Sequence, residues 1–249
     1  MLRFDVITLF PELFAPHLSQ GITRRASGSS IDVRMWPLRE HTDDPWRRVD
    51  DRPDGGGPGM VMLAEPLLRA VDTVQAERGD SAPVVHFTPT GARLDQAMVR
   101  EWASGRGAVL VCGRYEGIDQ RFIDARVTHE ISLGDFVLSG GELPALALLD
   151  AVARLQLGVL SAPSHEQDSF SAGLLEGPAY SRPERLAVDG EERAVPDVLM
   201  SGHHGDIARW RRDRALEWTA RRRPDLIVAA RAQGRLSPAD ESTLRGLAL

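Results

Sequence analysis

Residues 127–155 read VTHEISLGDFVLSGGELPALALLDAVARL and contain the pattern that decides the fold. The run at residues 127–131 is rich in β-branched side chains and predicts a strand, and a glycine-rich segment follows it at residues 132–144. Apolar residues with helical spacing then occupy residues 144–155, and Pro144 stands where a first helical turn tolerates proline. A strand, a glycine loop and a helix in this order predict one unit of an α/β fold.

The same alternation extends toward the N-terminus. Short apolar or β-branched runs predict further strands at residues 4–9, 31–36, 84–88 and 108–112. Helical spacing predicts helices at residues 63–78 and 95–103. Strands that alternate with helices predict a mostly parallel sheet covered by helices on both faces. We expect this α/β domain to span residues 1–160.

The texture of the chain changes after residue 160. The segment SAPSHEQDSFSAG at residues 161–173 is polar, rich in small residues and without either periodicity. We expect a flexible linker over residues 161–175. No strand pattern follows it, so residues 176–249 are expected to form a small helical domain.

Charge is distributed unevenly along the chain. The formal net charge of −6 excludes a protein covered in positive potential. All basic side chains apart from histidine are arginines, which excludes a Schiff-base lysine and a Walker A lysine. Residues 208–223 contain seven arginines and only two acidic residues, Asp213 and Glu217. This local excess of positive charge predicts a nucleic-acid-binding patch that includes Arg209 and Arg212.

The helix that carries these arginines is expected to be amphipathic. Ile207, Trp210, Ala215 and Trp218 fall on one face at 100° per residue, and the arginines at positions 209 and 212 fall opposite them. A solvated arginine face on a helix packed by two tryptophans is the simpler interpretation, and it is compatible with nucleic-acid binding.

Several kinds of site are excluded by composition. The single cysteine, Cys112, excludes an internal disulfide and a zinc site of the CxxC type. The histidines form no HExxH motif or spaced ligand cluster, so no metal ligand is predicted. The first residues contain no apolar run of the length that a signal peptide or a membrane span needs, so we expect a cytoplasmic protein that does not bind a membrane.

Three glycine-rich segments are candidates for ligand binding, at residues 50–62, 113–119 and 132–144. Glycine lets a backbone approach a ligand closely and adopt positive φ, so such loops at strand ends are typical of cofactor sites. None matches the GxGxxG fingerprint with its acidic ribose partner, and none is a P-loop. Taken singly, each segment is better explained as a tight turn.

Five motifs in sequence order resemble the TrmD family of bacterial tRNA (guanine-N1)-methyltransferases, namely GGGPGM at 55–60, GRYEGID at 113–119, SLGDFVLSGGELPA at 132–145, QDSFSAGLLEGPAYSRPE at 167–184 and VLMSGHHGDIARWRR at 198–212. The resemblance runs over nearly the whole chain. It implies a SPOUT fold, in which the C-terminal part of the first domain forms a trefoil knot that binds S-adenosylmethionine in a bent shape. The general rule that chains do not thread their own loops would instead predict an open sheet.

The resemblance also implies a set of cofactor contacts. The matching positions lie in three loops. They are Thr88, Pro89 and Gly91 in a first loop near residue 90, Gly113, Tyr115, Glu116 and Gly117 in a second loop at residues 113–119, and Ser132, Leu133, Gly134, Leu138, Gly140, Gly141 and Pro144 in a third loop at residues 132–144. Backbone amides and carbonyls of glycine loops can read the edges of adenine, and the two leucines can flank its ring. The chain departs from the family at His86, where the family usually has tyrosine, and at Asp54, where it usually has an aromatic residue, which leaves contacts at these two positions open.

Two residues match the family's catalytic positions. Guanine N1 carries a proton and needs a base, and Asp168 of the QDSF motif matches the catalytic aspartate. Arg154 matches the residue that would stabilise negative charge on guanine O6, and Ser169 is expected to help hold the target base. Without the resemblance, Asp168 would be interpreted as a solvated linker residue and Arg154 as a cation at a helix C-terminus.

The resemblance further implies the methylated position and the partners. The acceptor would be guanosine 37 of tRNA, 3′ of the anticodon, and a homodimer would share one tRNA between the knot of one subunit and the helical domain of the other. Mg²⁺ is implied as a helper, although no carboxylate cluster in the sequence identifies its site. Two alternatives stay open: an RNA-binding module without catalysis, and a related knotted methyltransferase that acts on ribose 2′-OH or another base.

Overall fold

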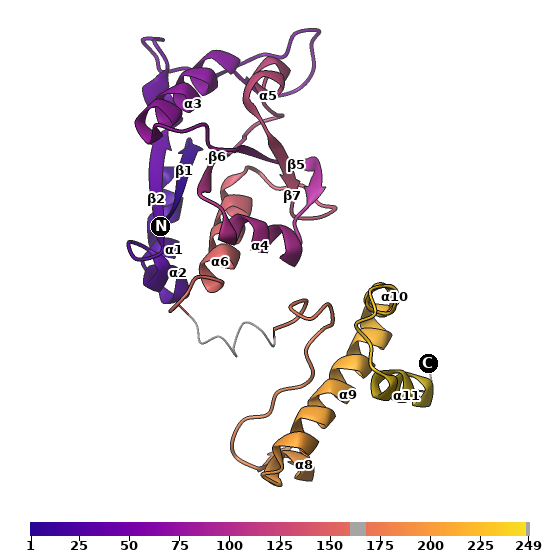
Figure 1. Cartoon of the computed structure of the whole chain (residues 1–249). Coiled ribbons are helices and arrows are strands. Elements are labelled where there is room, and N and C mark those ends of the chain that lie inside the picture. The colour runs from indigo at the N-terminus through magenta and orange to yellow at the C-terminus, as the bar shows by residue number, and fades with distance from the viewer. Residues whose placement is uncertain (160–167, 248–249) are drawn as a thin grey trace. The chain divides into compact units, whose positions relative to one another are not determined.

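A computed structural model describes residues 1–159 and 168–247 of the chain. The chain divides into two compact units, residues 1–161 and residues 162–249 (Figure 1).

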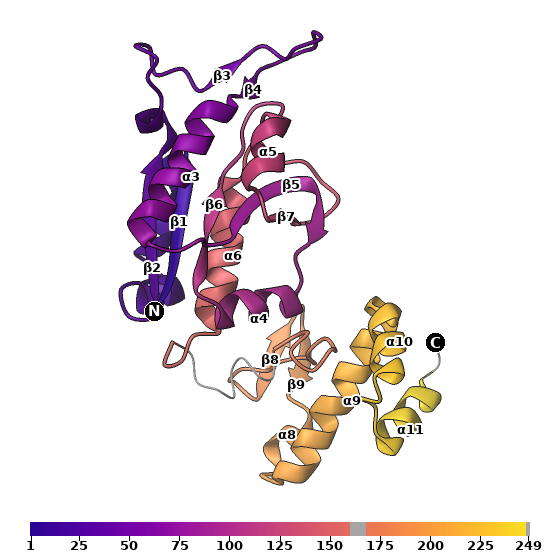
Figure 2. The ribbon, with the colours of Figure 1, turned by 45° about the horizontal axis from the view of Figure 1, so that its top comes forward.

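The first unit is built on a five-stranded sheet with the strand order β2-β1-β6-β5-β7. The strands are β1 (Leu2–Thr8), β2 (Ile31–Pro37), β5 (Val84–Arg93), β6 (Gly107–Val111) and β7 (His129–Ser132). Every neighbouring pair in this sheet is parallel. The predicted parallel α/β fold is therefore confirmed, whereas a small antiparallel pair, β3 (Asp50–Asp51) with β4 (Val61–Met62), was not predicted. Figure 2 shows this pair at the edge of the unit.

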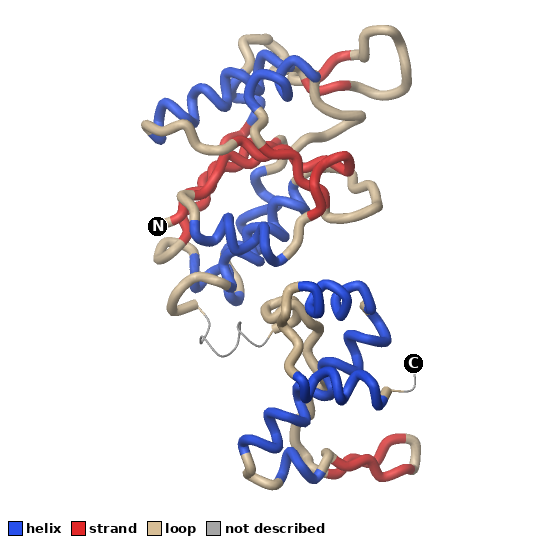
Figure 3. Tube along the Cα trace, turned by 45° about the vertical axis from the view of Figure 1, so that its right-hand side comes forward, coloured by secondary structure: helices blue, strands red, loops and turns tan. Residues whose placement is uncertain are grey.

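Helices cover both faces of the sheet (Figure 3). One layer contains α1 (Phe14–Leu18), α2 (Gly21–Ala26), α4 (Gln96–Ser104) and α6 (Glu142–Arg154), and the other contains α3 (Ala64–Arg78), α5 (Gln120–Arg126) and the short helix η2 (Leu38–His41). A second short helix, η1 (Pro11–Leu13), precedes α1. Successive side chains of β6 alternate between the layers, with Ala108 and Leu110 in one core and Val109 and Val111 in the other. A strand buried on both sides explains why this run is continuously apolar.

The second unit contains α8 (Asp197–Met200), α9 (His204–Arg222), α10 (Pro224–Ala232) and α11 (Pro238–Gly246) around a small apolar core. It also contains an antiparallel hairpin of β8 (Arg185–Val188) and β9 (Glu191–Ala194). The expectation that no strand follows the linker was therefore wrong. Asp189 and Gly190 connect the two strands, both with positive φ, as a two-residue hairpin turn requires. These strands are mostly exposed, so they lack the apolar alternation on which the prediction depended.

The packed face of α9 also differs from the prediction. Leu216, Thr219 and Ala220 are its buried residues, and the predicted face of Ile207, Trp210, Ala215 and Trp218 is only half-buried. The core of the second unit comes from α10 and α11 on the side opposite the one that the tryptophans suggested. No helix in the described part of the chain is both long enough and apolar enough to span a membrane.

Residues 168–175, expected to belong to a flexible linker, pack onto the second unit. Leu174 is buried in the core with Leu216, and the backbone N–H of Leu175 donates to Oγ1 of Thr219 at 3.0 Å. The rest of the expected linker, residues 161–167, lies outside the described residues.

Candidate active site

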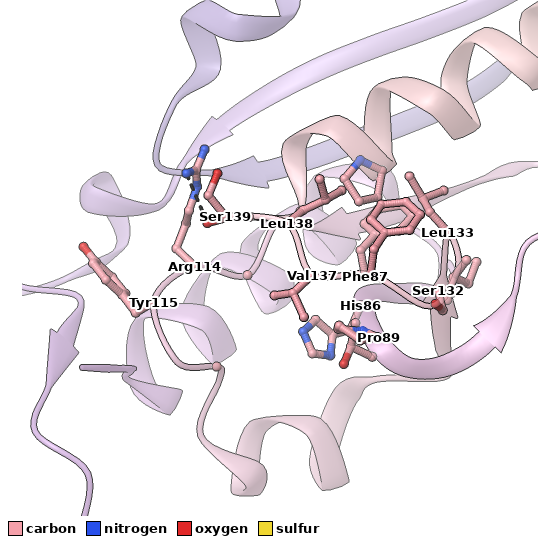
Figure 4. Close-up of a pocket in the computed structure, with 18 of the residues that line it drawn as sticks. His86, Phe87, Pro89, Arg114, Tyr115, Ser132, Leu133, Val137, Leu138 and Ser139 are labelled. Carbon is pink, nitrogen blue, oxygen red and sulfur yellow. Dashed lines mark hydrogen bonds between the residues drawn. The ribbon is translucent and has the colours of Figure 1, made fainter. Parts of the chain in front are cut away.

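Residues 86–89 of β5 and the glycine-rich segments at residues 113–119 and 132–144 meet in one cavity (Figure 4). The glycine-rich segment at residues 50–62 does not line this cavity. The cavity has a volume of about 250 Å³. Of the predicted cofactor contacts, it is lined by Thr88, Pro89, Gly113, Tyr115, Glu116, Gly117, Ser132, Leu133, Leu138, Gly140, Gly141 and Pro144. Segments that are weak signals separately in the sequence thus form one pocket, because the carboxyl ends of parallel strands lie at the same edge of a sheet.

The cavity wall also contains residues that the sequence analysis did not select, namely His86, Phe87, Arg114, Ile131, Phe136, Val137 and Ser139. Most of them are neighbours of predicted contacts within the same motifs, which is the signal that could have found them. Their apolar members surround Leu133 and Leu138, so this part of the pocket suits a flat aromatic ring.

Two predicted contacts, Gly91 and Gly134, do not line the cavity. Gly91 lies at the irregular pairing of β5 with β7, where a Cβ atom would stand 2.5 Å from the backbone nitrogen of Ile131. Gly134 has φ +152°, and its N–H donates to Oγ of Ser132 at 3.1 Å. Each glycine thus lies against a residue of the wall, Gly91 against Ile131 and Gly134 against Ser132.

Gly141 is required by the close approach of two loops. A Cβ atom at this position would stand 2.7 Å from Cα of Cys112 and 3.0 Å from the backbone nitrogen of Gly113. The Gly141 N–H donates to the carbonyl oxygen of Gly113 at 2.9 Å. The third loop therefore packs directly on the second, and α6 begins at this contact.

A buried ion pair lies next to this contact. An Nη atom of Arg114 is 2.9 Å from Oε2 of Glu142, a side chain at the start of α6 that is only 1% exposed. The other carboxylate oxygen accepts a hydrogen bond from the Thr8 hydroxyl at 2.8 Å. Arg114 also donates to the carbonyl oxygen of Ser139 at 3.2 Å, as Figure 4 shows. The pair therefore ties the second and third loops to the end of β1, which holds the glycine backbone in place.

Burial controls the protonation of two side chains near the cavity. Burial, and next the charge of Glu142, raise the pKa of the Cys112 thiol well above its usual range, so this thiol is not a nucleophile at neutral pH. Burial lowers the pKa of His86, against the opposing effect of Glu130, whose Oε1 lies 3.6 Å from Nδ1 of the imidazole. Both side chains are uncharged at neutral pH.

The two predicted catalytic residues belong to different units. Arg154 is the last residue of α6 in the first unit and is half-buried. Asp168 is half-buried at the start of the described part of the second unit, where its carbonyl oxygen accepts from the Ser171 N–H at 3.1 Å. The hydroxyl of Ser169 accepts from the Glu176 N–H at 3.1 Å. This turn places residues 168–170 of the motif next to the core of the second unit.

The predicted arginine patch on α9 is largely paired within the second unit. Arg209 and Arg212 bind the two carboxylate oxygens of Asp240, at 2.9 and 3.0 Å, and Arg209 also binds Asp213. Asp240 is buried, which by itself raises its pKa, but hydrogen bonds from Arg212, from the Ser237 N–H and from Arg209 outweigh this and hold the pKa at about 2. These two arginines therefore serve the packing of α9 against α11.

Other arginines of the patch stay more accessible. Arg211 is exposed, and no ion pair or hydrogen bond of its side chain is present among the described residues. The guanidinium of Arg222 stacks on the ring of Trp218 at 4.2 Å. The described residues contain no group of three or more His, Cys, Asp or Glu side chains placed to hold a metal ion.

Comparison with known proteins gives one consistent result. A family model described as tRNA (Guanine-1)-methyltransferase TrmD matches residues 2–229. A tRNA (guanine-N(1)-)-methyltransferase of Leptothrix cholodnii is 66% identical over 250 residues and covers 100% of both chains. Proteins of the same name from Methylibium petroleiphilum and Paracidovorax citrulli are 64% and 59% identical, each over 99% of this chain and 98% of their own length.

Proposed function

Because the chain belongs to the TrmD family of tRNA (guanine-1)-methyltransferases, we propose that it transfers a methyl group from S-adenosylmethionine to N1 of guanosine 37 in tRNA. The observation that carries the proposal is the convergence of residues 86–89 of β5 and of two glycine-rich loops, at residues 113–117 and 132–144, on one cavity beside a parallel sheet. Neither an RNA-binding module nor a structural protein needs such a cavity.

The donor set of the cavity fits the cofactor. Leu133 and Leu138 provide apolar surface for adenine, and the backbone at Gly113, Gly140 and Gly141 provides amides and carbonyls without side chains in the way. When bound, S-adenosylmethionine supplies a methyl group on a positively charged sulfur, which leaves as a neutral thioether. We also propose that the chain around the third loop forms the trefoil knot of SPOUT proteins, which the packing of Gly141 on the backbone of the second loop supports.

The proton of guanine N1 must be removed when N1 bonds to the methyl carbon. We assign this role to the carboxylate of Asp168, which accepts the proton as the carbon–sulfur bond breaks. Negative charge that develops on O6 is stabilised by the guanidinium of Arg154, and Ser169 helps to hold the base. The described residues would hold the donor and the base, and the donor would supply the methyl group without its bonding electrons, which would stay on sulfur.

The proposal extends to assembly and binding partners. We propose a cytoplasmic homodimer in which Arg154 of one subunit and Asp168 of the other act on one tRNA, and which does not use a membrane. Mg²⁺ is proposed as a helper without a site on the described residues. Arg209, Arg212 and the more accessible Arg211 are proposed to attract the tRNA backbone, with Arg211 expected to contribute more because Asp240 neutralises the other two.

The decisive experiment incubates the purified protein with methyl-labelled S-adenosylmethionine and two transcripts of one tRNA, with guanosine or adenosine at position 37. We expect 1-methylguanosine from the first transcript and no label in the second. Label on a ribose or on another base would identify a different methyltransferase. Calorimetry with S-adenosylmethionine completes the test, since RNA binding without cofactor binding would identify a module without catalysis.

A further inference from the structure

His86 occupies an unusual position in the wall of the cavity (Figure 4). It is only 6% exposed, and its Nδ1 atom has no hydrogen-bond partner in the described part of the protein. On the opposite side, Nε2 lies 3.2 Å from the place that a Cβ atom of residue 113 would occupy, so Gly113 leaves room for the ring. The imidazole therefore fills a tailored space between β7 and the second glycine loop.

The groups around His86 determine how its protonation would affect the binding of a charged ligand in the cavity. Glu130 of β7 is paired with it in the sheet register, and its Oε1 atom lies 3.6 Å from Nδ1. The other ionisable side chains that line the cavity are those of Arg114, Tyr115 and Glu116, and Cys112 and Glu142 are buried next to it. The strands and loops that form the wall also contain Arg93, His129, Asp119 and Asp135. Cys112 is uncharged, and the charge of Arg114 is paired with that of Glu142. A proton on His86 would thus add one positive charge to the wall of a small cavity, next to the carboxylate of Glu130.

We propose that His86 is a specificity-determining residue, which in its neutral form lets the cavity accept a sulfonium donor and in its protonated form favours the uncharged thioether product. The inference rests on the proposed use of S-adenosylmethionine. The donor and S-adenosylhomocysteine share the adenosine, the amino group and the carboxylate, and they differ in the methyl group and in the charge on sulfur. A second positive charge in the same cavity repels the donor alone.

The direction of the pH dependence follows from the burial of His86. Because burial lowers its pKa, the imidazole is neutral at pH 8 and becomes protonated only on clear acidification. The dissociation constant of the donor should then rise more than that of the product. Both ligands carry the same amino and carboxyl groups, so changes in the protonation of these groups affect both dissociation constants equally and cancel in their ratio. The ratio therefore reports the effect of the charge on sulfur.

The test measures both dissociation constants by calorimetry with the full chain between pH 8 and pH 5. The ratio of the donor constant to the product constant should rise on the order of tenfold as the pH falls. A ratio that stays flat while both ligands bind would overturn the inference and leave the proposed function intact. Failure to bind either ligand at pH 8 would overturn both.

Two variants assign the effect to the imidazole. His86→Gln keeps a polar side chain of similar reach that does not titrate, so the ratio should become independent of pH. Glu130→Gln removes the carboxylate that favours the protonated ring, so the rise should move to lower pH. A slope that survives in His86→Gln would assign the effect to another group and contradict the inference.

Discussion

The glycine-lined cavity of the first unit and the arginine-rich helix α9 of the second unit were both predicted from sequence, and the structure treats them differently. Most of the predicted glycine-loop residues come together around one cavity. Two of the predicted arginines instead bind Asp240, a buried residue of α11. A glycine is required where the adjacent backbone leaves no room for a side chain, which depends on local structure. An arginine can bind another molecule only if its guanidinium is not already paired with a carboxylate of the same protein.

This difference shows how a count of charges along the sequence can overestimate the number of unpaired arginines. The excess of arginine in residues 208–223 was counted against acidic residues nearby in sequence. A further acidic partner, shared by Arg209 and Arg212, lies far along the chain at Asp240, and its capping interaction with Ser237 fixes the start of α11. A local charge balance therefore overestimates the free charge of a helix that packs against another helix.

The largest expected effect tests whether the second unit supplies the base while the first unit binds the cofactor. Asp168→Asn should lower turnover roughly 10²- to 10⁴-fold, because the amide cannot accept the N1 proton. Binding of S-adenosylmethionine to the first unit should not change. Single-turnover methylation and calorimetry on the same preparation check both statements.

Asp189→Asn is the matched control for this change. Asp189 lies in the hairpin turn with φ +53°, a conformation that asparagine also adopts. Its turnover should equal that of the unchanged protein. Near-normal turnover in Asp168→Asn would remove that residue from the role of the base.

The second effect concerns the ion pair that holds the glycine loops. Arg114→Met leaves the buried carboxylate of Glu142 without its cation, which should cost about 3 to 5 kcal/mol of unfolding free energy. Urea unfolding of the full chain measures it. The double variant Arg114→Met with Glu142→Gln removes the charge as well and should recover part of the loss. If the single variant lost less than the double one, the pair would not be the element that holds the loops.

The third effect compares a glycine that packs closely against another loop with a glycine that has free space around it. Gly141→Ala places a methyl group against the backbone of residues 112 and 113 and should cost about 1 to 3 kcal/mol, together with weaker donor binding. Gly105→Ala is the control in the same unit, because its Cβ atom would meet nothing closer than 3.6 Å. Equal donor affinity in the two variants would show that the loop contact does not shape the cavity.

The smallest effects distinguish paired from accessible arginines. Arg209→Ala with Arg212→Ala should lower the unfolding free energy by about 1 to 2 kcal/mol at pH 7, because the pKa of Asp240 would return from about 2 toward its ordinary value of 3.8. Since the pKa of Asp240 is depressed in the folded state, its stabilising contribution is complete above about pH 4 and is lost as the pH falls through 2. Denaturation curves at pH 7 and pH 3 test this.

Arg211→Ala is the matched variant on the exposed side of the same helix. It should leave the unfolding free energy unchanged and reduce the salt dependence of tRNA binding by about one unit of slope. A salt slope that falls only in the double variant would show that the paired arginines make the phosphate contacts.

Much of the fold and of the cavity could be predicted from residues that act locally. The strand at residues 107–111 is apolar throughout because both of its faces are buried, and Pro144 lies in the first turn of α6 as expected. The hairpin at residues 185–194 was missed although Asp189 and Gly190 are a typical turn pair, because its strands have no apolar face. The cavity residues His86 and Arg114 stand near predicted contacts in the sequence, but the burial of His86 and the pairing of Arg114 with Glu142 arise only in the tertiary structure.

The sequence by itself determined the parallel α/β architecture and the glycine loops at the strand ends, since strand patterns and the absence of a side chain act through the adjacent backbone. Only the tertiary structure decided which charges are paired, which face of α9 is packed and that a histidine lies buried in the cavity wall. These features depend on partners that are distant in sequence, and the energy of a charge depends on which groups surround it after folding.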